Sequence, residues 1–202
     1  MRTNGNSKLN AIWILLLFVL FRVNAPAQEK KHELELGLGI WNMNEIINTF
    51  SDIIISSIPN DVKMKDGNSF GSLHAGYKYR FTDRLGLGGL LAYDYSYDKG
   101  ELSGVEVGKF YKNHYTLAFE ADYNYVVSDK FKMYALAGLG GTLYTLRYKD
   151  FDDSRKNDSD ATPYFTFQIT PVGLKFGKNI GGFLEFGFGY RGIINAGAFI
   201  RL

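Results

Sequence analysis

Apolar and polar side chains alternate along most of this chain, and the pattern is clearest at its C-terminal end. Between positions 194 and 202 every second residue is aliphatic, and the residues between them are Asn195, Gly197, Phe199 and Arg201. Successive side chains of a β-strand point to opposite faces, so this alternation predicts strands with one apolar and one polar face. The same pattern predicts further strands over 33–41, 70–81, 85–97, 112–127, 131–148, 163–176 and within 182–191.

The connections between these eight predicted strands alternate in length. Short turns fall at 82–84, 128–130 and 177–179, and long connections fall at 42–69, 98–111 and 149–162. Strands joined by successive hairpins form an up-and-down antiparallel sheet, and eight of them can close into a barrel. The last hairpin turns tightly near Gly192, which predicts a low barrel wall there.

Two segments depart from simple alternation. Residues 131–148 are apolar or glycine at both parities, so the pattern does not assign their outward face. In 163–176 the apolar positions change parity between Ile169 and Val172, and Pro171 lies at the change. Proline cannot donate a ladder hydrogen bond, so it predicts a β-bulge at this point. In 182–191 the predicted apolar face consists of Leu184, Phe186, Phe188 and Tyr190.

The first long connection contains a helical pattern instead. Ile47, Phe50 and Ile54 recur at helical spacing, which predicts an amphipathic helix over 43–58. Its charged residues are acidic, whereas a helix lying on a membrane surface is normally basic on its polar face. We therefore interpret the helix as a lid that packs on the barrel mouth. The alternatives are an interfacial helix and a simple cover for apolar residues at the mouth.

Charged residues of both signs occupy the polar face of the predicted strands. The interior of an eight-stranded barrel is just wide enough for side chains to fill, and buried charges need partners. A membrane barrel turns its polar face inward, whereas a soluble ligand-binding barrel would need these charges on the other face. We predict a lumen closed by salt bridges, with a gated proton or solute path as the alternative. The predicted cluster consists of Glu35, His74, Lys78, Arg80, Glu120, Asp122, Lys175, Glu185 and Arg201.

The N-terminal segment has the features of a secretory signal. Basic residues precede an apolar run over 9–21, and the small residues Ala25 and Ala27 frame a cleavage site. The apolar run is shorter than the roughly 20 residues of a membrane-spanning helix. We expect residues 1–27 to be removed after Ala27, which leaves a single domain over 28–202.

Composition narrows the function classes. Without residues 1–27 the chain has 20 basic and 21 acidic residues, so its net charge of −1 gives no indication of nucleic-acid binding. Cysteine is absent, which excludes disulfides and a lipidated cysteine. Aromatic residues reach 16% and are mostly Tyr and Phe. They predict two girdles at membrane interfaces, an outer one of Tyr93, Tyr95, Tyr97, Tyr115, Tyr144 and Tyr148 and an inner one of Tyr77, Tyr79, Phe81, Tyr123, Tyr125 and Phe176.

Over 33–202 the chain resembles the small eight-stranded outer-membrane β-barrels of Gram-negative bacteria, the class of OmpX and the OmpA transmembrane domain. The resemblance rests on the strand–turn rhythm, on the run over 168–177 and on the closing strand. Members of this class usually end in Phe, which the barrel-assembly machinery reads, whereas this chain ends in Leu202. The resemblance implies an all-β, antiparallel up-and-down transmembrane barrel in the bacterial outer membrane, and it implies no catalytic motif.

Residues that could carry chemistry are few. His114 near the outer end of its strand could serve a lipid-modifying enzyme, but its parity points inward and no serine accompanies it. The acidic residues over 150–160 could bind calcium, but they lack the glycine and terminal glutamate of an EF-hand loop and are mixed with basic residues. We expect no catalytic site, metal site or cofactor.

We therefore predict a monomeric outer-membrane barrel with a structural, adhesive or surface-protective role. Its expected partners are outer-membrane lipid, lipopolysaccharide and, during insertion, the barrel-assembly machinery. The first alternative is a lidded barrel that binds or transports a small apolar ligand, and the second is an enzyme that modifies lipid A.

Overall fold

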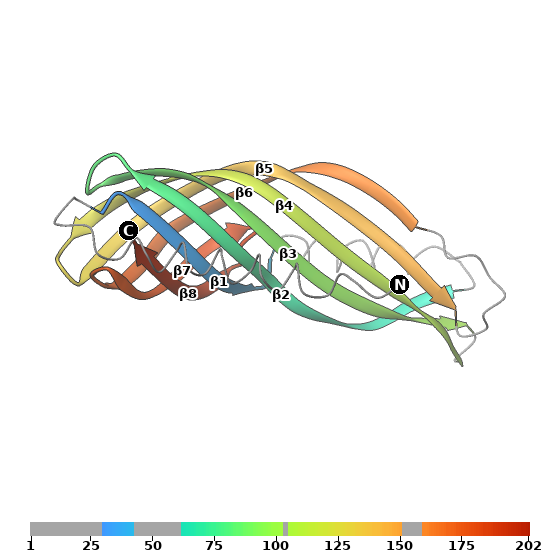
Figure 1. Ribbon diagram of the computed structural model, residues 1–202. Coiled ribbons are helices and arrows are strands. Elements are labelled where there is room, and N and C mark those ends of the chain that lie inside the picture. Colours follow the sequence, from blue (N-terminus) through green and yellow to red (C-terminus); the bar gives the residue numbers. More distant parts are fainter. Residues whose placement is uncertain (1–29, 43–61, 103–104, 151–158) are drawn as a thin grey trace, which may run out of the picture.

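The computed structural model describes residues 30–42, 62–102, 105–150 and 159–202, and in this part of the chain eight antiparallel strands close into a barrel. Each strand pairs with its neighbours in sequence, and β1 also pairs with β8 (Figure 1). The strands are β1 (His32–Ile40), β2 (Val62–Arg80), β3 (Leu85–Leu102), β4 (Val105–Val127), β5 (Phe131–Asp150), β6 (Ser159–Gly177), β7 (Ile180–Gly189) and β8 (Ile194–Arg201).

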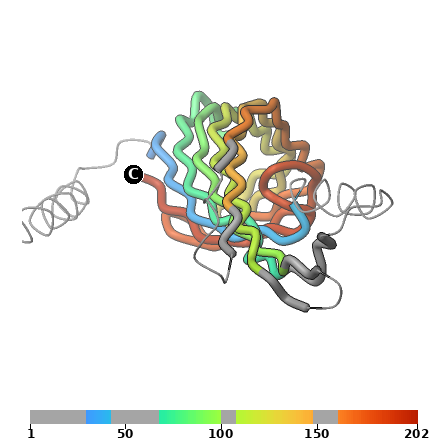
Figure 2. The backbone as a smooth tube through the Cα atoms, turned by 90° about the vertical axis from the view of Figure 1, so that its right-hand side faces the viewer, coloured from blue at the N-terminus to red at the C-terminus, as the bar shows by residue number. Residues whose placement is uncertain are grey.

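The first and last strands close the ring. Glu33 of β1 lies opposite Arg201 of β8, and Ile40 lies opposite Ile194. Figure 2 shows the ring viewed from the end opposite to the short turns. The start of β1, the end of β8 and the three short turns share one end of the barrel, as the even number of hairpin-linked strands requires (Figure 1).

The barrel wall is uneven in height. Strands β2 to β6 have 18–23 residues, whereas β1, β7 and β8 have 8–10. The low wall predicted near Gly192 is therefore present, between Gly189 and Ile194. The long connection predicted over 98–111 is wrong, because β3 and β4 continue through it. Only five of the fourteen residues over 98–111 are apolar or aromatic. Hydrophobic alternation does not detect a strand that has no continuous apolar face.

The structure also resolves the outward face of the ambiguous fifth strand. Leu139 is 62% exposed, and Leu143 and the other odd-numbered residues around it also face out. Tyr134, Leu136 and Thr142 are buried inside. The predicted outer-girdle position of Tyr144 is wrong, because its ring faces the lumen and packs on His114 at 4.9 Å between centroids.

The bulge predicted at Pro171 is confirmed. Between the paired residues Tyr134–Gly173 and Leu136–Thr170, β5 has one residue and β6 has two, Pro171 and Val172. The extra residue shifts the inward positions of β6 from even-numbered to odd-numbered residues, so that Lys175 faces inward. The prediction that Tyr190 faces out is wrong, because β7 ends at Gly189 and Tyr190 is 0% exposed inside the barrel. Gly189 has a φ of +143°, a backbone conformation that breaks the alternation.

Some predictions lie outside the described residues. These are the signal segment with its cleavage site at Ala27, the loop helix over 43–58 and most of the acidic segment. In the part of the chain that is described, no helix is long and apolar enough to cross a membrane.

Side-chain packing inside the barrel predicts a sharp difference between two glycines. A Cβ added to Gly173 would lie 2.4 Å from the Tyr134 ring, whereas one on Gly141 would meet no atom closer than 3.9 Å. We expect Gly173→Val to lower the free energy of unfolding by about 1–3 kcal/mol through overpacking. Gly141→Val should change it by less than about 0.5 kcal/mol. Urea unfolding in detergent checks this, and equal midpoints for the two variants would contradict it.

Candidate functional site

Arg191 lies at the centre of a buried ionic cluster in the lumen. It follows β7 in the tight turn of the low wall, and its side chain is 0% exposed. The guanidinium donates to Glu120 at 2.5 and 2.8 Å, to Glu185 at 3.0 and 3.1 Å and to Glu35 at 3.2 Å. One cation thus joins carboxylates from β4, β7 and β1 across the barrel interior.

The turn that delivers Arg191 depends on close backbone packing. Gly192 has a φ of +108°, and a Cβ there would lie 2.5 Å from the carbonyl oxygen of Ile40. The backbone N–H of Arg191 donates to the Gln168 side chain at 2.9 Å. The turn is therefore held against β1 on one side and β6 on the other.

Two lysines form the next layer toward the short turns. Lys78 donates to both oxygens of Glu35, at 3.0 and 3.1 Å, and lies 3.8 Å from carboxylate oxygens of both Glu120 and Asp122. Lys175 donates to Glu33 and, at 2.6 Å, to Glu35. Each lysine and each glutamate in this layer has more than one partner, so the layer is a network rather than a set of isolated pairs.

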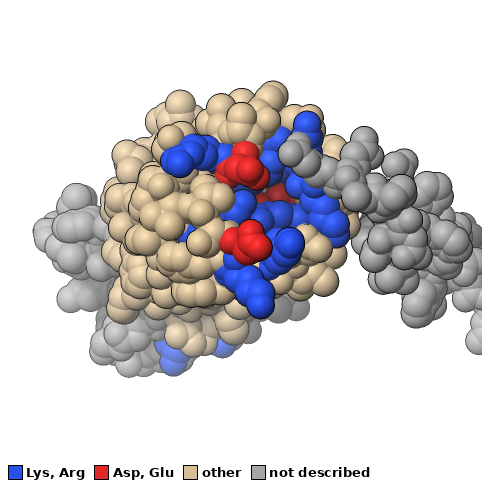
Figure 3. Space-filling view, turned by 90° about the vertical axis from the view of Figure 1, so that its left-hand side faces the viewer, with Lys and Arg blue, Asp and Glu red and all other residues tan. Residues whose placement is uncertain are grey.

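Two arginines close the cluster at the end with the short turns. Arg80 donates to Asp122 at 2.7 and 2.8 Å and to Glu33 at 2.9 Å, and Arg201 donates to Glu33 at 2.6 Å. Both are slightly exposed, at 6% and 8%. Figure 3 looks at this end and shows Lys and Arg side chains gathered around it, with a few acidic residues among them.

The charges of the cluster balance. Among the described residues it holds five carboxylates (Glu33, Glu35, Glu120, Asp122 and Glu185) and five cations (Lys78, Arg80, Lys175, Arg191 and Arg201). Removing one ion from water costs several kcal/mol, and only well-placed partners offset this cost. Equal numbers of both signs allow every charge to be paired, so the lumen can be both charged and closed to water.

Neutral side chains satisfy the remaining carboxylate oxygens. Tyr134 donates to Glu185 at 2.6 Å, Tyr190 to Glu120 at 2.9 Å and Asn195 to Glu185 at 2.5 Å. Gly138 makes room for Tyr190, because a Cβ there would lie 2.0 Å from the tyrosine oxygen. The rings thus occupy space between the ionic groups.

The structure joins eight of the nine residues of the predicted cluster by ion pairs, and places His74 beside them without a hydrogen bond to the cluster. His74 is buried at 1% exposure, but neither ring nitrogen has a hydrogen-bond partner, so the expectation that it bonds to the ionic cluster is wrong. It lies one level nearer the low wall, where its ring faces Phe183 at 6.4 Å between centroids. Strand parity gives the direction of a side chain but not the neighbours it meets.

Sequence reasoning missed two charged members of the cluster. Glu33 has the inward parity of β1, but it stands at the start of the strand. Arg191 has the polar parity too, but it adjoins a turn, where side chains normally face solvent. Charge balance gave no sign that residues were missing, because the predicted set already held four acidic and four basic residues besides His74.

The other candidate residues are not assembled into a site. His114 is 3% exposed inside the barrel and packed on Tyr144 and Tyr164, so its ring does not reach the outer face of the wall. The lid residues Ile47, Phe50 and Ile54 lie outside the described residues, as does most of the 150–160 segment. Within the described ranges, no three His, Asp or Glu side chains are grouped as metal ligands.

A closed up-and-down barrel with paired charges inside and apolar side chains outside defines the class of small β-barrel membrane proteins. Residues 13–197 match the family model of the outer membrane protein beta-barrel domain. The chain belongs to this family, and it is a protein of the bacterial outer membrane.

Among solved structures, the fold is similar to that of Ail, the attachment invasion locus protein of Yersinia pestis, in complex with the heparin analogue sucrose octasulfate. The TM-score is 0.44 and the sequence identity 12%, over 85% of this chain and 95% of that chain. The comparison with curated proteins gives no match.

The central position of Arg191 predicts a large effect on stability. Arg191→Leu would leave Glu35, Glu120 and Glu185 without their shared guanidinium, and breaking a buried ion pair in this way costs about 3–5 kcal/mol. Arg84→Leu, at an exposed turn position, should change the unfolding free energy by less than about 0.5 kcal/mol. Thermal unfolding in detergent separates them, and similar melting temperatures would contradict the prediction.

Proposed function

We propose that this protein spans the outer membrane as a closed, non-conducting barrel, and that its role is structural or adhesive, carried by the surface of β2–β6 outside the membrane. The observation that carries this proposal is the lumen filled by salt bridges, in which Arg191 and its three carboxylates are all at most 4% exposed. A transport pathway would need water or an empty channel at this level, and ion pairs occupy it instead.

The outer face supports the membrane-spanning orientation. Leu36, Leu117 and Phe119 are 59–65% exposed, although burying such side chains is favourable in water. Soluble monomers rarely expose contiguous apolar patches larger than a few hundred Å². Arg or Lys facing lipid at the bilayer midplane costs about 2–4 kcal/mol. On β2 to β4, no charged residue faces out between the level of Tyr77 and Phe119 and the level of Tyr93 and Tyr115.

The uneven wall supports a role at the outer surface. A strand tilted by about 40° rises about 2.5 Å per residue, so roughly 10 residues cross the apolar band of about 25 Å. Strands β2 to β6 are about twice that length. Because their short turns lie at the inner end, the surplus length projects outward as a continuous sheet that could contact other molecules.

Ion flux tests the closed lumen. Vesicles that contain the purified protein should lose entrapped ions no faster than empty vesicles. Arg201→Leu removes a partner of Glu33 near the inner end, and we expect it to lower the melting temperature without raising the flux. A leaky Arg201→Leu barrel would instead indicate that the network is a gate.

Spin labels test the orientation. The chain has no cysteine, so single cysteines can be placed at Leu36, Phe119 and Phe186 without competing sites. Their labels should collide with oxygen, which concentrates among acyl chains, and not with a water-soluble nickel chelate. A label at Asp129 in a short turn provides the aqueous control. Water-accessible labels at the first three positions, or a protein that stays soluble without detergent, would contradict the membrane-spanning proposal.

A further inference from the structure

The inner mouth of the lumen, which is its end at the three short turns, holds more cations than carboxylates. The ionic cluster is balanced, with five of each sign. Lys132, near the start of β5, adds a further cation at this end. It lies opposite the buried Lys175 of β6, and residues directly opposite each other share a face of the sheet, so Lys132 points inward and is half-buried. The mouth therefore carries a positive charge that the cluster does not compensate.

Other cations are the strongest electrostatic neighbours of the Lys132 ammonium. Arg201 of β8 and Arg80 of β2 repel it, and Asp83 and Glu33 attract it less strongly. Among the residues that the structure describes, its side chain forms no ion pair or hydrogen bond. A half-buried cation between two others is unfavourable unless an anion joins them.

The two nearby carboxylates cannot supply this anion. Glu33 is already shared by three cations: Arg80 donates to one of its oxygens at 2.9 Å, Arg201 donates to the other at 2.6 Å, and Lys175 donates to it as well. Asp83 is exposed in the turn after β2, where water screens its charge. The partner that Lys132 lacks must therefore come from outside the described part of the chain.

The two guanidiniums beside Lys132 have unused hydrogen-bond donors. Arg80 donates from its terminal nitrogens to Asp122 and Glu33, and its Nε has no acceptor. Arg201 donates from Nε to Glu33 and from Nη1 to the backbone oxygen of Lys178, and its Nη2 has no acceptor. Buried polar groups normally have partners, so an acceptor at the mouth would complete both side chains. Both reach the surface there, at 6% and 8% exposed.

These three cations come from three different strands and meet around one carboxylate. Arg80 and Arg201 bind the two oxygens of Glu33 from β2 and β8, and Lys132 lies beside both from β5. A phosphate group has several strong acceptor oxygens and up to two negative charges. One anion of this kind can therefore accept from more than one of these donors, and it offsets the excess charge of the mouth.

The rim around the mouth is cationic too. Lys130 and Lys178 are exposed in two of the short turns, and Lys30 is exposed before β1 at the same end. The acidic side chains of the described turns are Asp83 and Asp129. Figure 3 shows Lys and Arg side chains around this end of the barrel. A positive rim raises the local concentration of anions at the mouth.

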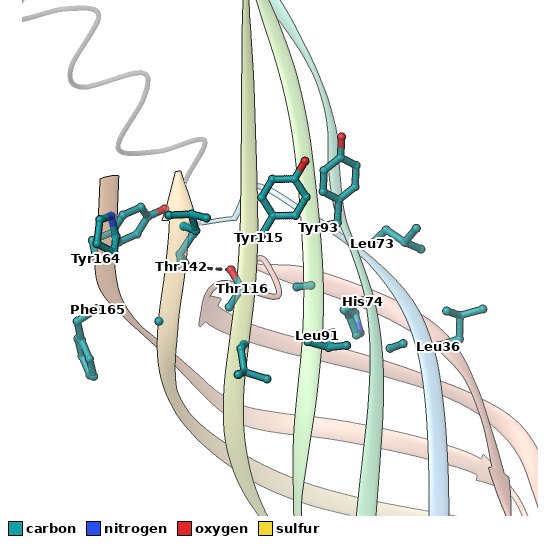
Figure 4. Close-up of a pocket in the computed structure, with 16 residues that line it drawn as sticks. Leu36, Leu73, His74, Leu91, Tyr93, Tyr115, Thr116, Thr142, Tyr164 and Phe165 are labelled. Carbon is teal, nitrogen blue, oxygen red and sulfur yellow. Dashed lines mark hydrogen bonds between the residues drawn. The ribbon is translucent and has the colours of Figure 1, made fainter. Parts of the chain in front are cut away.

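The outer part of the lumen has the opposite balance. Its buried charged residues, among those that are described, are Asp94, Asp98 and Lys112. Neutral groups lie next to them, such as the hydroxyls of Thr116 and Thr142, which are 2.7 Å apart (Figure 4). This distribution favours an anion at the inner mouth over one in the outer part of the lumen.

We propose that the inner mouth binds one phosphate group from the aqueous side. The ammonium of Lys132 pairs with it directly, and Arg80 and Arg201 donate the N–H groups that the cluster leaves unused. The site lies inside the ring of strands, and its cations face the lumen rather than the surrounding lipid. It would exist equally in a barrel with another role, because it depends on the mouth alone.

Calorimetric titration of the full protein with inorganic phosphate, in a maltoside detergent at fixed ionic strength, tests the proposal. The wild type should bind one phosphate per chain. Lys132→Gln should lower the affinity by about tenfold or more, because it removes a hydrogen bond and an ion pair to a charged ligand. Lys132→Arg keeps the charge and should retain most of the affinity. A wild type that binds no phosphate, or a Lys132→Gln variant with unchanged affinity, would overturn the site.

The matched control is Lys130→Gln, which makes the same charge change in the exposed turn two residues away. Its phosphate affinity should stay within about twofold of the wild type, because water screens an exposed charge. Equal losses in Lys130→Gln and Lys132→Gln would show that phosphate responds to the general charge of the rim. That result would overturn a site at Lys132.

Thermal unfolding provides a second readout that a purely structural role of Lys132 would not produce. In chloride buffer Lys132→Gln should melt at or above the wild-type temperature, because it relieves the repulsion by Arg201 and Arg80. In phosphate at the same ionic strength the wild type should gain stability and the variant should not, since a ligand that binds the folded state stabilises it. A variant that is already less stable in chloride would show that Lys132 is paired within the protein, and this would overturn the site.

A lipid headgroup carries the same phosphate chemistry, and short-chain phosphatidylglycerol distinguishes the two sources. Binding of inorganic phosphate without lipid supports the aqueous source. Binding of the lipid but not of inorganic phosphate would overturn that source. The closed, membrane-spanning barrel is tested separately by ion flux and spin labels, so a mouth that binds no phosphate overturns the site alone.

Discussion

The pairing of ionised groups inside a narrow lumen is the constraint on which this barrel depends. Its interior holds five carboxylates and five cations, and most of them are at most a few per cent exposed. An unpaired charge in such a place would cost several kcal/mol, which is a large share of the stability of a domain of this size. The network therefore connects six of the eight strands, because its charged residues lie on β1, β2, β4, β6, β7 and β8 and in the turn after β7, and Glu33 alone is shared by three cations.

The low wall is part of this arrangement. Ending β7 at Gly189 allows Tyr190 and Arg191 to turn into the barrel instead of extending it. The turn at Gly192 then packs against the end of β1, and Gln168 of β6 binds its backbone. A taller hairpin would carry these side chains away from the carboxylates of β1 and β4. The uneven height of the wall thus places Arg191 in the ionic cluster as well as shaping the outer surface.

The residues on the two faces of the sheet are placed under different physical constraints. Inside, charges are placed where another element supplies the opposite sign, and glycines such as Gly138 and Gly173 yield space to the rings of Tyr190 and Tyr134. Outside, no pairing is needed, and residues vary with height from aliphatic through aromatic to lysine. The same strands can therefore present an ion-paired interior and a graded surface, because successive side chains point to opposite sides.

The sequence by itself determined the eight strands, the short turns, the bulge at Pro171 and the inward direction of most charged residues, because alternation and turn chemistry are local properties. It did not determine the height of β3 and β4, whose outer parts have no continuous apolar face, or the outward face of β5, where both parities are apolar. Only the tertiary structure decided that Arg191 is the centre of the cluster, that Glu33 belongs to it and that His74 does not. Those assignments depend on which residues of non-adjacent strands meet across the lumen, and strand parity contains no information about that distance.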